Sequence, residues 1–280
     1  MLKHCSILLV GLLLVFSCSN DQEEDESQMT IDFEFSDSFE TSNDNLDELF
    51  PSNGLRWTGT QIVNPENVEN ELSLSSEFSS EGNKSLKILS RKSDRRLSKA
   101  DIEKSGLFAP ENSVVTIKAD FYIDSEENIE NLLLIDLECR SCWDPSVPDN
   151  QSPGLRLMMS GGNDYLSIER GKIGADLLAQ TNVRFPRKEW VSITWESFLS
   201  PEENGGNKLL VNDQLVLSQN GMNLPNTMVF KNLFSQEGIS FELQTPVLYE
   251  RVQIGATANP DAGDILLYVD NVSITIKKEN

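Results

Sequence analysis

From residue 29 onward, apolar and polar residues alternate in many short stretches, and this period of two constrains the fold more than any other feature. Between Val114 and Ile123, every second residue is apolar. A strand places such residues on one face of a sheet, whereas a helix repeats them every three or four positions. The same pattern predicts further strands at residues 132–138, 154–159, 165–170, 190–196, 208–217, 251–256 and 265–276.

Turn-forming residues separate these stretches. Gly, Asn, Asp and Pro gather at residues 160–163, 203–207 and 259–264. Only residues 98–105 and 173–180 have a weakly helical pattern. Many short strands joined by turns indicate an all-β sandwich or barrel. Because the sequence shows neither a linker nor an internal repeat, we predict a single antiparallel β-sandwich of the jelly-roll type over residues 29–280.

The first 17 residues have the pattern of a secretory signal. Lys3 precedes an apolar run from Ile7 to Phe16, which is shorter than the ~20 residues of a membrane-spanning helix. The ending Val-Phe-Ser-Cys at 15–18 resembles a bacterial lipobox, which implies that Cys18 is lipidated, with palmitate among its acyl chains, and begins the mature protein. The alternative is an uncleaved signal followed by a solvated run of charges.

Residues 18–28 are acidic and have no apolar periodicity, so we expect a disordered tether there. The Cys-Ser dipeptide and the acidic run after it resemble the export signal of surface lipoproteins in Bacteroidetes-type bacteria. This resemblance implies a protein that contacts the outer membrane through its lipid anchor only and faces the cell exterior.

Charge and histidine content exclude several functions. The chain has 45 Asp and Glu against 23 Lys and Arg, a net charge of −22, which argues against a nucleic-acid partner. The single histidine is His4, inside the predicted signal. A mature chain without histidine excludes Ser-His-Asp and Cys-His catalysis, histidine zinc sites and histidine-ligated haem.

The second half of the chain resembles the concanavalin A-like lectin/glucanase superfamily. Residues 185–195, FPRKEWVSITW, lead through a glycine-containing turn to 209–217, LLVNDQLVL, as a strand leads to a hairpin in that superfamily. Residues 252–256 and 267–272 are similar to the closing strands of its polysaccharide lyase-like and laminin-G-like members. The resemblance covers nearly all of residues 30–276 and implies a jelly roll whose concave sheet holds glycan in a groove.

If the apolar positions face the core, the alternate positions line that groove. The resemblance then makes the following residues glycan-binding, or catalytic in a lyase: Lys118, Tyr122, Asp136, Glu138, Arg156, Tyr165, Glu169 and Trp190. Aromatic rings present apolar faces to sugars, and charged groups hydrogen-bond hydroxyls or pair with acidic sugars. The alternative is that these residues form the solvated face of an ordinary antiparallel sheet.

The candidate residues favour binding over cleavage. Glycoside hydrolases of the superfamily carry Glu-X-Asp-X-X-Glu, and the spacing of Asp136 and Glu138 does not match it. We therefore expect a lipoprotein that binds extracellular polysaccharide, alone or beside neighbouring glycan-uptake proteins. One alternative is a polysaccharide lyase that acts on an acidic glycan through Tyr and Arg. The other is a structural or adhesion lipoprotein that contacts protein.

Cys139 and Cys142 form a C-x-x-C pair. One such pair excludes a four-cysteine zinc site within a single chain, and a redox motif would need a thioredoxin-like βαβ context. Outside the inner membrane we expect a local disulfide, which pins the loop carrying Trp143. That tryptophan is either a sugar platform or part of the loop's own core.

Two further features concern ions and charge. Glu40 near the first strand and Asp270 on the last resemble the structural calcium site of carbohydrate-binding jelly rolls, so calcium is the one cofactor predicted, and none is required for activity. The basic cluster Arg91–Arg96 either binds an acidic glycan or pairs with nearby acids, and we favour the second.

Overall fold

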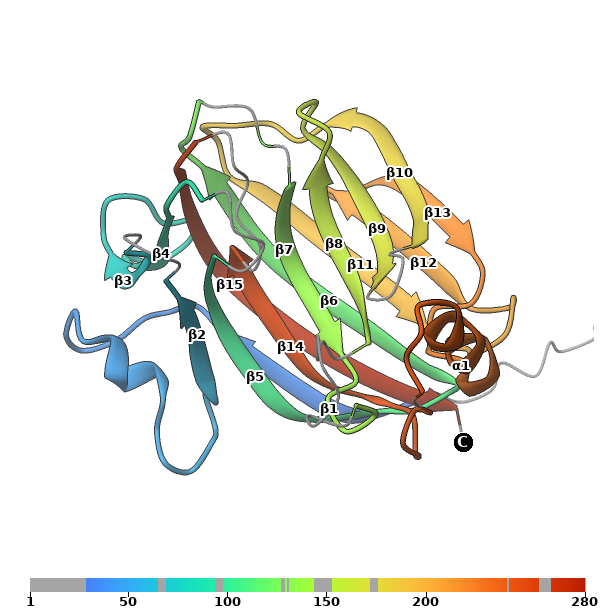
Figure 1. Ribbon diagram of the computed structural model, residues 1–280. Helices are drawn as coiled ribbons and strands as arrows, with labels where there is room; N and C mark the ends of the chain where they lie inside the picture. The colour runs from blue at the N-terminus through green and yellow to red at the C-terminus, as the bar shows by residue number, and fades with distance from the viewer. Residues whose placement is uncertain are drawn as a thin grey trace, which may run out of the picture.

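The computed structural model describes residues 29–64, 69–93, 98–126, 129, 131–143, 153–171, 176–240, 242–256 and 263–279. They form two antiparallel sheets packed face to face, with sheet B in front of sheet A in Figure 1. This confirms the predicted single-domain β-sandwich. Residues 1–28, with Cys18 and the predicted signal and tether, lie outside the described residues.

Sheet A has eight strands. Its path is β13 (Gln214–Asn220), β12 (Gly206–Val211), β11 (Val191–Phe198), β6 (Ser113–Ile123), β15 (Ile265–Glu279), β4 (Ser85–Ser90) and β3 (Glu71–Ser75), and β1 (Met29–Asp37) pairs with β15. Sheet B has seven strands. Its path is β10 (Asp176–Arg184), β9 (Tyr165–Gly171), β8 (Gly154–Ser160), β7 (Asn131–Glu138), β14 (Tyr249–Ala256), β5 (Lys99–Ala109) and β2 (Gly59–Val63).

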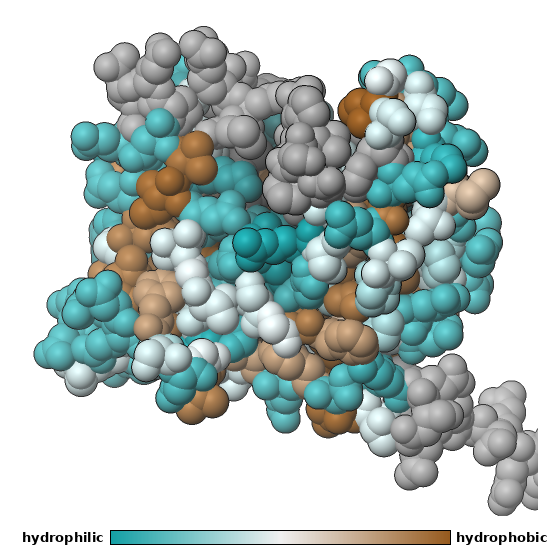
Figure 2. All heavy atoms as spheres, turned by 60° about the horizontal axis from the view of Figure 1, so that its bottom comes forward, coloured by the Kyte–Doolittle hydropathy of each residue, from teal (hydrophilic) through white to brown (hydrophobic). Residues whose placement is uncertain are grey.

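Alternation along each strand builds the core between the sheets. In β11, buried and half-buried residues alternate without a break. Ile117, Phe121 and Trp195 from sheet A are buried together with Ile135 and Ile168 from sheet B. The outer faces therefore carry the remaining polar positions, and Figure 2 shows a surface on which hydrophilic residues predominate and apolar ones form small patches.

The long apolar stretch predicted at 208–217 is a hairpin of two strands, β12 and β13. Asn212 and Asp213 form its turn with φ values of 48° and 61°. Two consecutive residues with positive φ are typical of the tight turn that suits the right-handed twist of a hairpin.

The helical expectations were wrong for the described part of the chain. Residues 99–105 belong to β5 and residues 176–180 to β10; residues 173–175 lie outside the described ranges. In β5, buried Ala100 and Ile102 face the core while Glu103 points outward, which is the period of a strand. Pairing with β2 on one side and β14 on the other outweighs the local helical preference.

One α-helix, α1 (Thr227–Gln236), lies at one end of the sandwich (Figure 1). The Asn226 side chain accepts hydrogen bonds from the backbone N–H groups of Met228 and Val229, which caps the first turn. Phe230 and Phe234 are its buried residues. A 3₁₀-helix, η1 (Leu46–Leu49), follows β1. Within the described residues, no helix has the length and apolar character needed to cross a membrane.

Candidate functional site

The structure divides the predicted glycan-binding residues between the two sheets. Lys118 and Tyr122 lie on β6 of sheet A, and Trp190 directly precedes β11 of that sheet. The other five lie on β7, β8 and β9 of sheet B: Asp136, Glu138, Arg156, Tyr165 and Glu169. Outer faces of a sandwich point in opposite directions, so the expectation of one shared groove was wrong. Alternation tells which side of a strand faces the core, but not which sheet the strand joins.

A row of five polar residues crosses the middle of sheet B. Neighbouring members are register partners on adjacent strands, in the order Glu103, Gln253, Asp136, Arg156 and Glu169. Register partners in an antiparallel sheet present their side chains on the same face. We call these five residues the polar row.

Two members of the polar row and two of its neighbours are buried although they lie on an outer face. Gln253 and Asp101 are 0% exposed, and Asp136 and Glu138 are each 3% exposed. Side chains on a flat or convex outer face would remain largely hydrated.

Two arginines hold the carboxylates of this face in place. Arg251 pairs with Glu103 at 3.0 Å and donates from Nε to Glu138 at 2.8 Å. Arg156 Nε lies 3.6 Å from Asp136 Oδ2. Both guanidinium groups are therefore already neutralised by the protein's own carboxylates.

Two glycines make room for these side chains. A Cβ at Gly171 would lie 2.5 Å from the Arg156 guanidinium, and a Cβ at Gly154 would lie 2.8 Å from Asp136 Oδ1. Any larger residue at either position would push the ion pair out of place. The geometry of Arg156 and Asp136 therefore depends on glycine in the adjacent strands.

The face is acidic overall. Among the described residues at its centre, five carboxyl groups (Asp101, Glu103, Asp136, Glu138 and Glu169) outnumber three cationic groups (Arg156, Arg251 and Lys99). Burial raises the pKa of Asp101 well above its ordinary value. Burial also works against the charge of Glu103, but Arg251 and hydrogen bonds from Ser105 and Gln61 outweigh it, so the Glu103 pKa is lowered. The Asp101 carboxyl is thus a potential hydrogen-bond donor, and the Glu103 carboxylate is an acceptor.

Four side chains of this face have buried polar atoms without hydrogen-bond partners. These atoms are both side-chain polar atoms of Gln253, both oxygens of Asp101, Oδ1 of Asp136 and Nε of Arg156. An unsatisfied buried polar group costs about 1–3 kcal/mol of stability. Proteins rarely keep several such groups together, and a functional role is one of the standard explanations.

Asp101, Glu103, Arg251 and Gln253 were missed by the sequence reasoning. The strand at 251–256 was predicted correctly, but its outward residues were not added to the site. Asp101 and Glu103 were missed because their stretch was assigned a helical character. The alternation of charged and apolar residues from Lys99 to Ser105 is the signal that points to them.

Tyr165 lies at the start of β9, away from the polar row. Its register partner is Ser160, and four residues separate it from Glu169, about 13 Å along an extended strand. Glu169 has only a long contact, 3.5 Å, with Ser167 Oγ among the interactions of the described residues. The structure therefore does not bring Tyr165 next to Arg156.

Trp143 and Arg91 take structural roles. Trp143 is 5% exposed, and its ring lies 5.2 Å from that of Phe234 in edge-to-face geometry, which is loop core and not a sugar platform. Arg91 pairs with Asp264 at 3.0 Å and lies 3.8 Å from Glu71. Residues 94–96 of the basic cluster lie outside the described residues.

The predicted calcium pair binds backbone N–H groups. Glu40 Oε1 accepts from Asn83 and Lys84 at 2.7 and 2.9 Å, and Asp270 Oδ2 accepts from Ser80 at 2.8 Å. Within the described ranges, no three His, Cys, Asp or Glu residues form a group that could hold a metal ion. Carboxylate oxygens directed at N–H donors hold the loop at 80–84, and calcium stays a prediction.

The cysteine pair is joined as predicted. Cys139 and Cys142 form a disulfide directly after β7, and both residues are fully buried. The bridge fixes the turn that leads to Trp143. Gln244 N donates a hydrogen bond to the Cys142 carbonyl at 3.0 Å, which ties the segment after α1 to this turn.

Comparison with known proteins places the fold. No protein-family profile matches the sequence, and no curated protein matches it. Solved structures do match. An endo-β-1,4-glucuronan lyase from the fungus Trichoderma reesei is 10% identical, with a TM-score of 0.57 over 88% of this chain and 95% of that one.

Two further solved structures are similar over comparable lengths. The cellulose-induced protein Cip1 is 14% identical, with a TM-score of 0.53 over 86% of this chain and 96% of that one. An alginate lyase from Aplysia kurodai is 16% identical, with a TM-score of 0.51 over 88% of this chain and 98% of that one. The chain therefore shares the jelly-roll β-sandwich fold with these proteins.

Proposed function

We propose that this protein binds an uncharged polysaccharide on the outer face of sheet B, at the polar row. The observation that carries the proposal is the polar row itself, in which partly exposed Arg156 and Glu169 adjoin buried Asp136, whose Oδ1 has no partner. Sugar hydroxyls both donate and accept, so a glycan lying on this face brings partners of both kinds. Solved neighbours of the same fold that are polysaccharide lyases support a glycan as the ligand class.

The charge of the face favours a neutral polymer. An acidic glycan needs free cations, whereas Arg156 and Arg251 are paired with carboxylates of the protein. The Glu169 carboxylate takes no part in these ion pairs, and its negative charge would repel a uronate. Hydroxyl groups carry no such penalty, and charge-assisted hydrogen bonds to carboxylates are strong.

Glu169 offers the sharpest test, because it is partly exposed and takes no part in the ion pairs of the row. The full chain is run on native gels cast with laminarin, xyloglucan or galactomannan. We expect at least one polymer to retard the native protein, and Glu169→Gln to weaken that retardation at least fivefold. Glu196→Gln, on the outer face of sheet A, is the matched control and is expected to migrate like the native protein.

Retardation that is equal in Glu169→Gln and Glu196→Gln would place the glycan elsewhere. Unchanged mobility in every neutral lane would contradict the proposal and favour the alternative of a protein-contacting adhesion lipoprotein. Circular dichroism of each variant confirms that the fold is intact.

A polysaccharide lyase is the second candidate, favoured by the names of the solved neighbours. A lyase acting on an acidic glycan through Tyr and Arg needs both groups at the same sugar. Here Tyr165 lies about 13 Å along β9 from the polar row. Ultraviolet absorbance of an unsaturated product, measured with glucuronan and alginate, separates the two functions. An increase that depends on Arg156 would establish the lyase.

Cell-surface anchoring belongs to the same proposal. We propose that Cys18 is acylated and holds the protein in the outer membrane, facing outward, where polysaccharide is accessible. Incorporation of labelled palmitate into the native chain, with none in Cys18→Ala, is the expected result. Label in Cys18→Ala, or resistance of the native protein to protease added to intact cells, would contradict it.

A further inference from the structure

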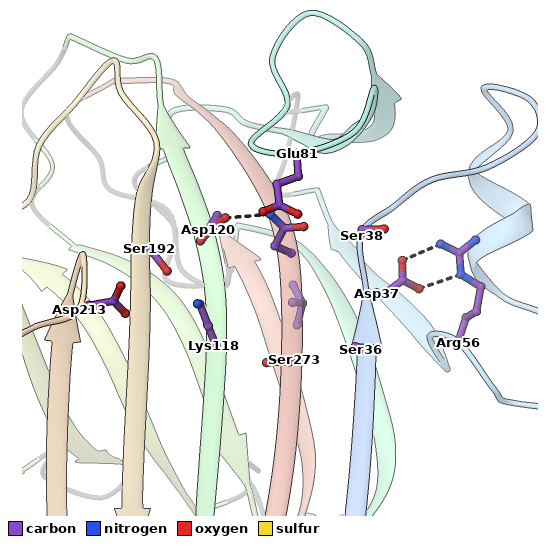
Figure 3. Close-up of a pocket in the computed structure, with 12 residues that line it drawn as sticks. Ser36, Asp37, Ser38, Arg56, Glu81, Lys118, Asp120, Ser192, Asp213 and Ser273 are labelled. Atoms are coloured by element: carbon purple, nitrogen blue, oxygen red, sulfur yellow. Dashed lines mark hydrogen bonds and ion pairs between the residues drawn. The ribbon is translucent and has the colours of Figure 1, made fainter.

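A hollow of about 670 Å³ opens on the outer face of sheet A, on the opposite side of the sandwich from the polar row. Figure 3 shows Lys118 and Asp120 on β6 beside Ser192 on β11, with Glu81 reaching in from the loop above them. Asp213, from the turn of the β12–β13 hairpin, lies at its other side. Residues of four strands (β1, β6, β11 and β15), the two loops that carry Arg56 and Glu81, and one turn thus line this hollow.

Sheet register brings these groups together. Ser192 is the register partner of Asp120, and Asp120 is the partner of Asp270 on β15. In the next row, Lys118 is the partner of Ser273. Because these residues face outward from adjacent strands, the floor of the hollow is built by the sheet and not by a mobile side chain.

The floor contains polar atoms without partners. Asp120 is 8% exposed. Its Oδ2 accepts hydrogen bonds from Ser80 Oγ at 2.7 Å and Asn271 Nδ2 at 3.0 Å, while Oδ1 has no partner. The Ser192 hydroxyl is likewise buried without one. Free hydrogen-bonding capacity therefore remains on a rigid floor.

The rim supplies groups of both signs. Lys118, Glu81 and Asp213 are exposed, and within the described part of the chain their side chains form no hydrogen bond or ion pair. The other cation lining the hollow, Arg56, is committed to Asp37 through two hydrogen bonds of 2.6 and 2.7 Å. The hollow thus offers one free ammonium donor among several carboxylate acceptors.

This combination selects the chemistry of the ligand. An anion would meet Asp120, Glu81 and Asp213, and a cation would meet Lys118. Neighbouring hydroxyls on one molecule satisfy both, because one donates to a carboxylate while the next accepts from the ammonium. An uncharged polyhydroxylated molecule fits the hollow best.

An aromatic ledge borders the hollow one row further along the strands. Tyr122 is two residues from Asp120 on β6, about 7 Å away. Tyr122 is buried: its ring stacks on Phe78 at 4.5 Å and lies 5.7 Å from the ring of Trp190, which it supports from below. Trp190 is partly exposed and precedes Ser192 by two residues. A ring with an apolar face can pack on this ledge while its hydroxyls reach the hollow.

We propose that the outer face of sheet A carries a second saccharide site for a neutral pyranose unit. Lys118 and Asp120 hydrogen-bond its hydroxyls, and the partly exposed ring of Trp190, which lies against buried Tyr122, supports its apolar face. The site is separate from the polar row and does not depend on the function proposed for sheet B.

Tryptophan fluorescence reports this site selectively. The chain has four tryptophans, and Trp57, Trp143 and Trp195 are 1%, 5% and 1% exposed, whereas Trp190 is partly exposed. Acrylamide therefore quenches mainly Trp190. The full chain is titrated with laminarin, xyloglucan and galactomannan. At saturation with at least one of them, we expect the quenching constant to fall at least twofold.

Lys118→Met keeps the length of the side chain but removes its donors, and it is expected to raise the half-saturating concentration at least fivefold. The matched control is Lys208→Met, an exposed lysine on the same sheet that pairs with Glu196 at 3.2 Å; it is expected to titrate like the native protein. Trp190→Phe removes the signal and confirms its source.

Quenching that no polymer reduces would overturn the proposal, as would equal effects of Lys118→Met and Lys208→Met. The signal arises on sheet A, so this test fails or succeeds separately from the gel assay of Glu169→Gln on sheet B.

Discussion

Gln253 is a buried amide that makes no hydrogen bond through its side chain, although it lies between two acids of the polar row. Methionine has a similar length and no polar atom. Replacing an unsatisfied buried group by an apolar one of similar shape removes its desolvation penalty. We therefore predict that Gln253→Met raises the free energy of unfolding by about 1 kcal/mol and weakens retardation by neutral polysaccharide. Urea unfolding and the native gel measure the two effects.

Ser90→Ala is the control for Gln253→Met. Ser90 is also fully buried with an unpartnered hydroxyl, but it lies on β4 of the other sheet. It is expected to gain a little stability and to bind polysaccharide like the native protein. Loss of stability together with binding in Gln253→Met would show that the amide is structural.

Asp270 makes stability depend on pH with an unusual sign. The residue is fully buried, and burial raises its pKa to about 6. Hydrogen bonds from the backbone N–H groups of Ser80, Asn271 and Glu81 lower the pKa, whereas the nearby charge of Asp120 raises it further. The folded state therefore binds the proton of the Asp270 carboxyl more tightly than the unfolded state does. This stabilisation of the folded state is fully present below about pH 4 and is lost as the pH rises through 6. The stability gap between native protein and Asp270→Asn is predicted to narrow by about 1–3 kcal/mol from pH 4 to pH 7.

Asp264→Asn is the control with the opposite sign. Burial works against the charge of Asp264, but hydrogen bonds from Lys92 and Arg91 outweigh it and lower its pKa. The stabilisation by the Asp264 carboxylate is lost only as the pH falls. The difference in free energy of unfolding between native protein and Asp264→Asn should therefore not narrow toward pH 7. Urea unfolding at pH 4 and pH 7 measures the free energy of unfolding of the native protein and both variants. If the difference between native protein and Asp270→Asn is the same at the two pH values, the raised pKa of Asp270 is contradicted.

At the scale of single elements, the disulfide after β7 gives the next prediction. It closes a very short loop, with a sequence separation of 3. Closure of so short a loop restricts the unfolded chain by about 2 kcal/mol. Reduction is predicted to lower the free energy of unfolding by that amount, measured in urea with and without dithiothreitol. The double variant Cys139→Ala/Cys142→Ala should have the same free energy of unfolding as the reduced native protein, and dithiothreitol should not change it. If dithiothreitol leaves the free energy of unfolding of the native protein unchanged, the prediction is wrong.

Strand pattern predicted most of the fold and only part of the site. β6, β7, β8 and β9 fall within one residue of their predicted bounds, because each has one face in the core and alternation records that face. β5 was missed because a weakly helical pattern was preferred over the alternation from Lys99 to Glu103, and pairing with β2 and β14 makes this stretch a strand. Helix α1 was not predicted either.

The site depends on sheet pairing, which the local pattern does not record. Arg156 and Asp136 were predicted together, and they are register partners. Lys118 and Asp136 were also predicted together, yet they point to opposite sides of the molecule. Which strands become neighbours is decided by long-range packing between residues far apart in the chain, so no single stretch of sequence reveals it.

At the scale of the whole molecule, the two proposed sites lie on opposite outer faces. The sheets of a sandwich pack about 10 Å apart, and each outer face looks away from the other. A glycan strand lying on one face cannot reach the other without passing around an edge. If both sites are occupied, each protein molecule holds two separate strands of polymer.

The native chain is therefore predicted to bridge a neutral polysaccharide that both faces bind. Light scattering should rise as protein is added, pass through a maximum and fall when excess protein occupies each strand separately. Glu169→Gln and Lys118→Met should each reduce the maximum at least severalfold, because losing either face leaves a molecule with one site. Glu196→Gln and Lys208→Met serve as controls on sheet A. A single-face variant that scatters like the native chain would mean that bridging arises through pairs of molecules and not through two faces of one.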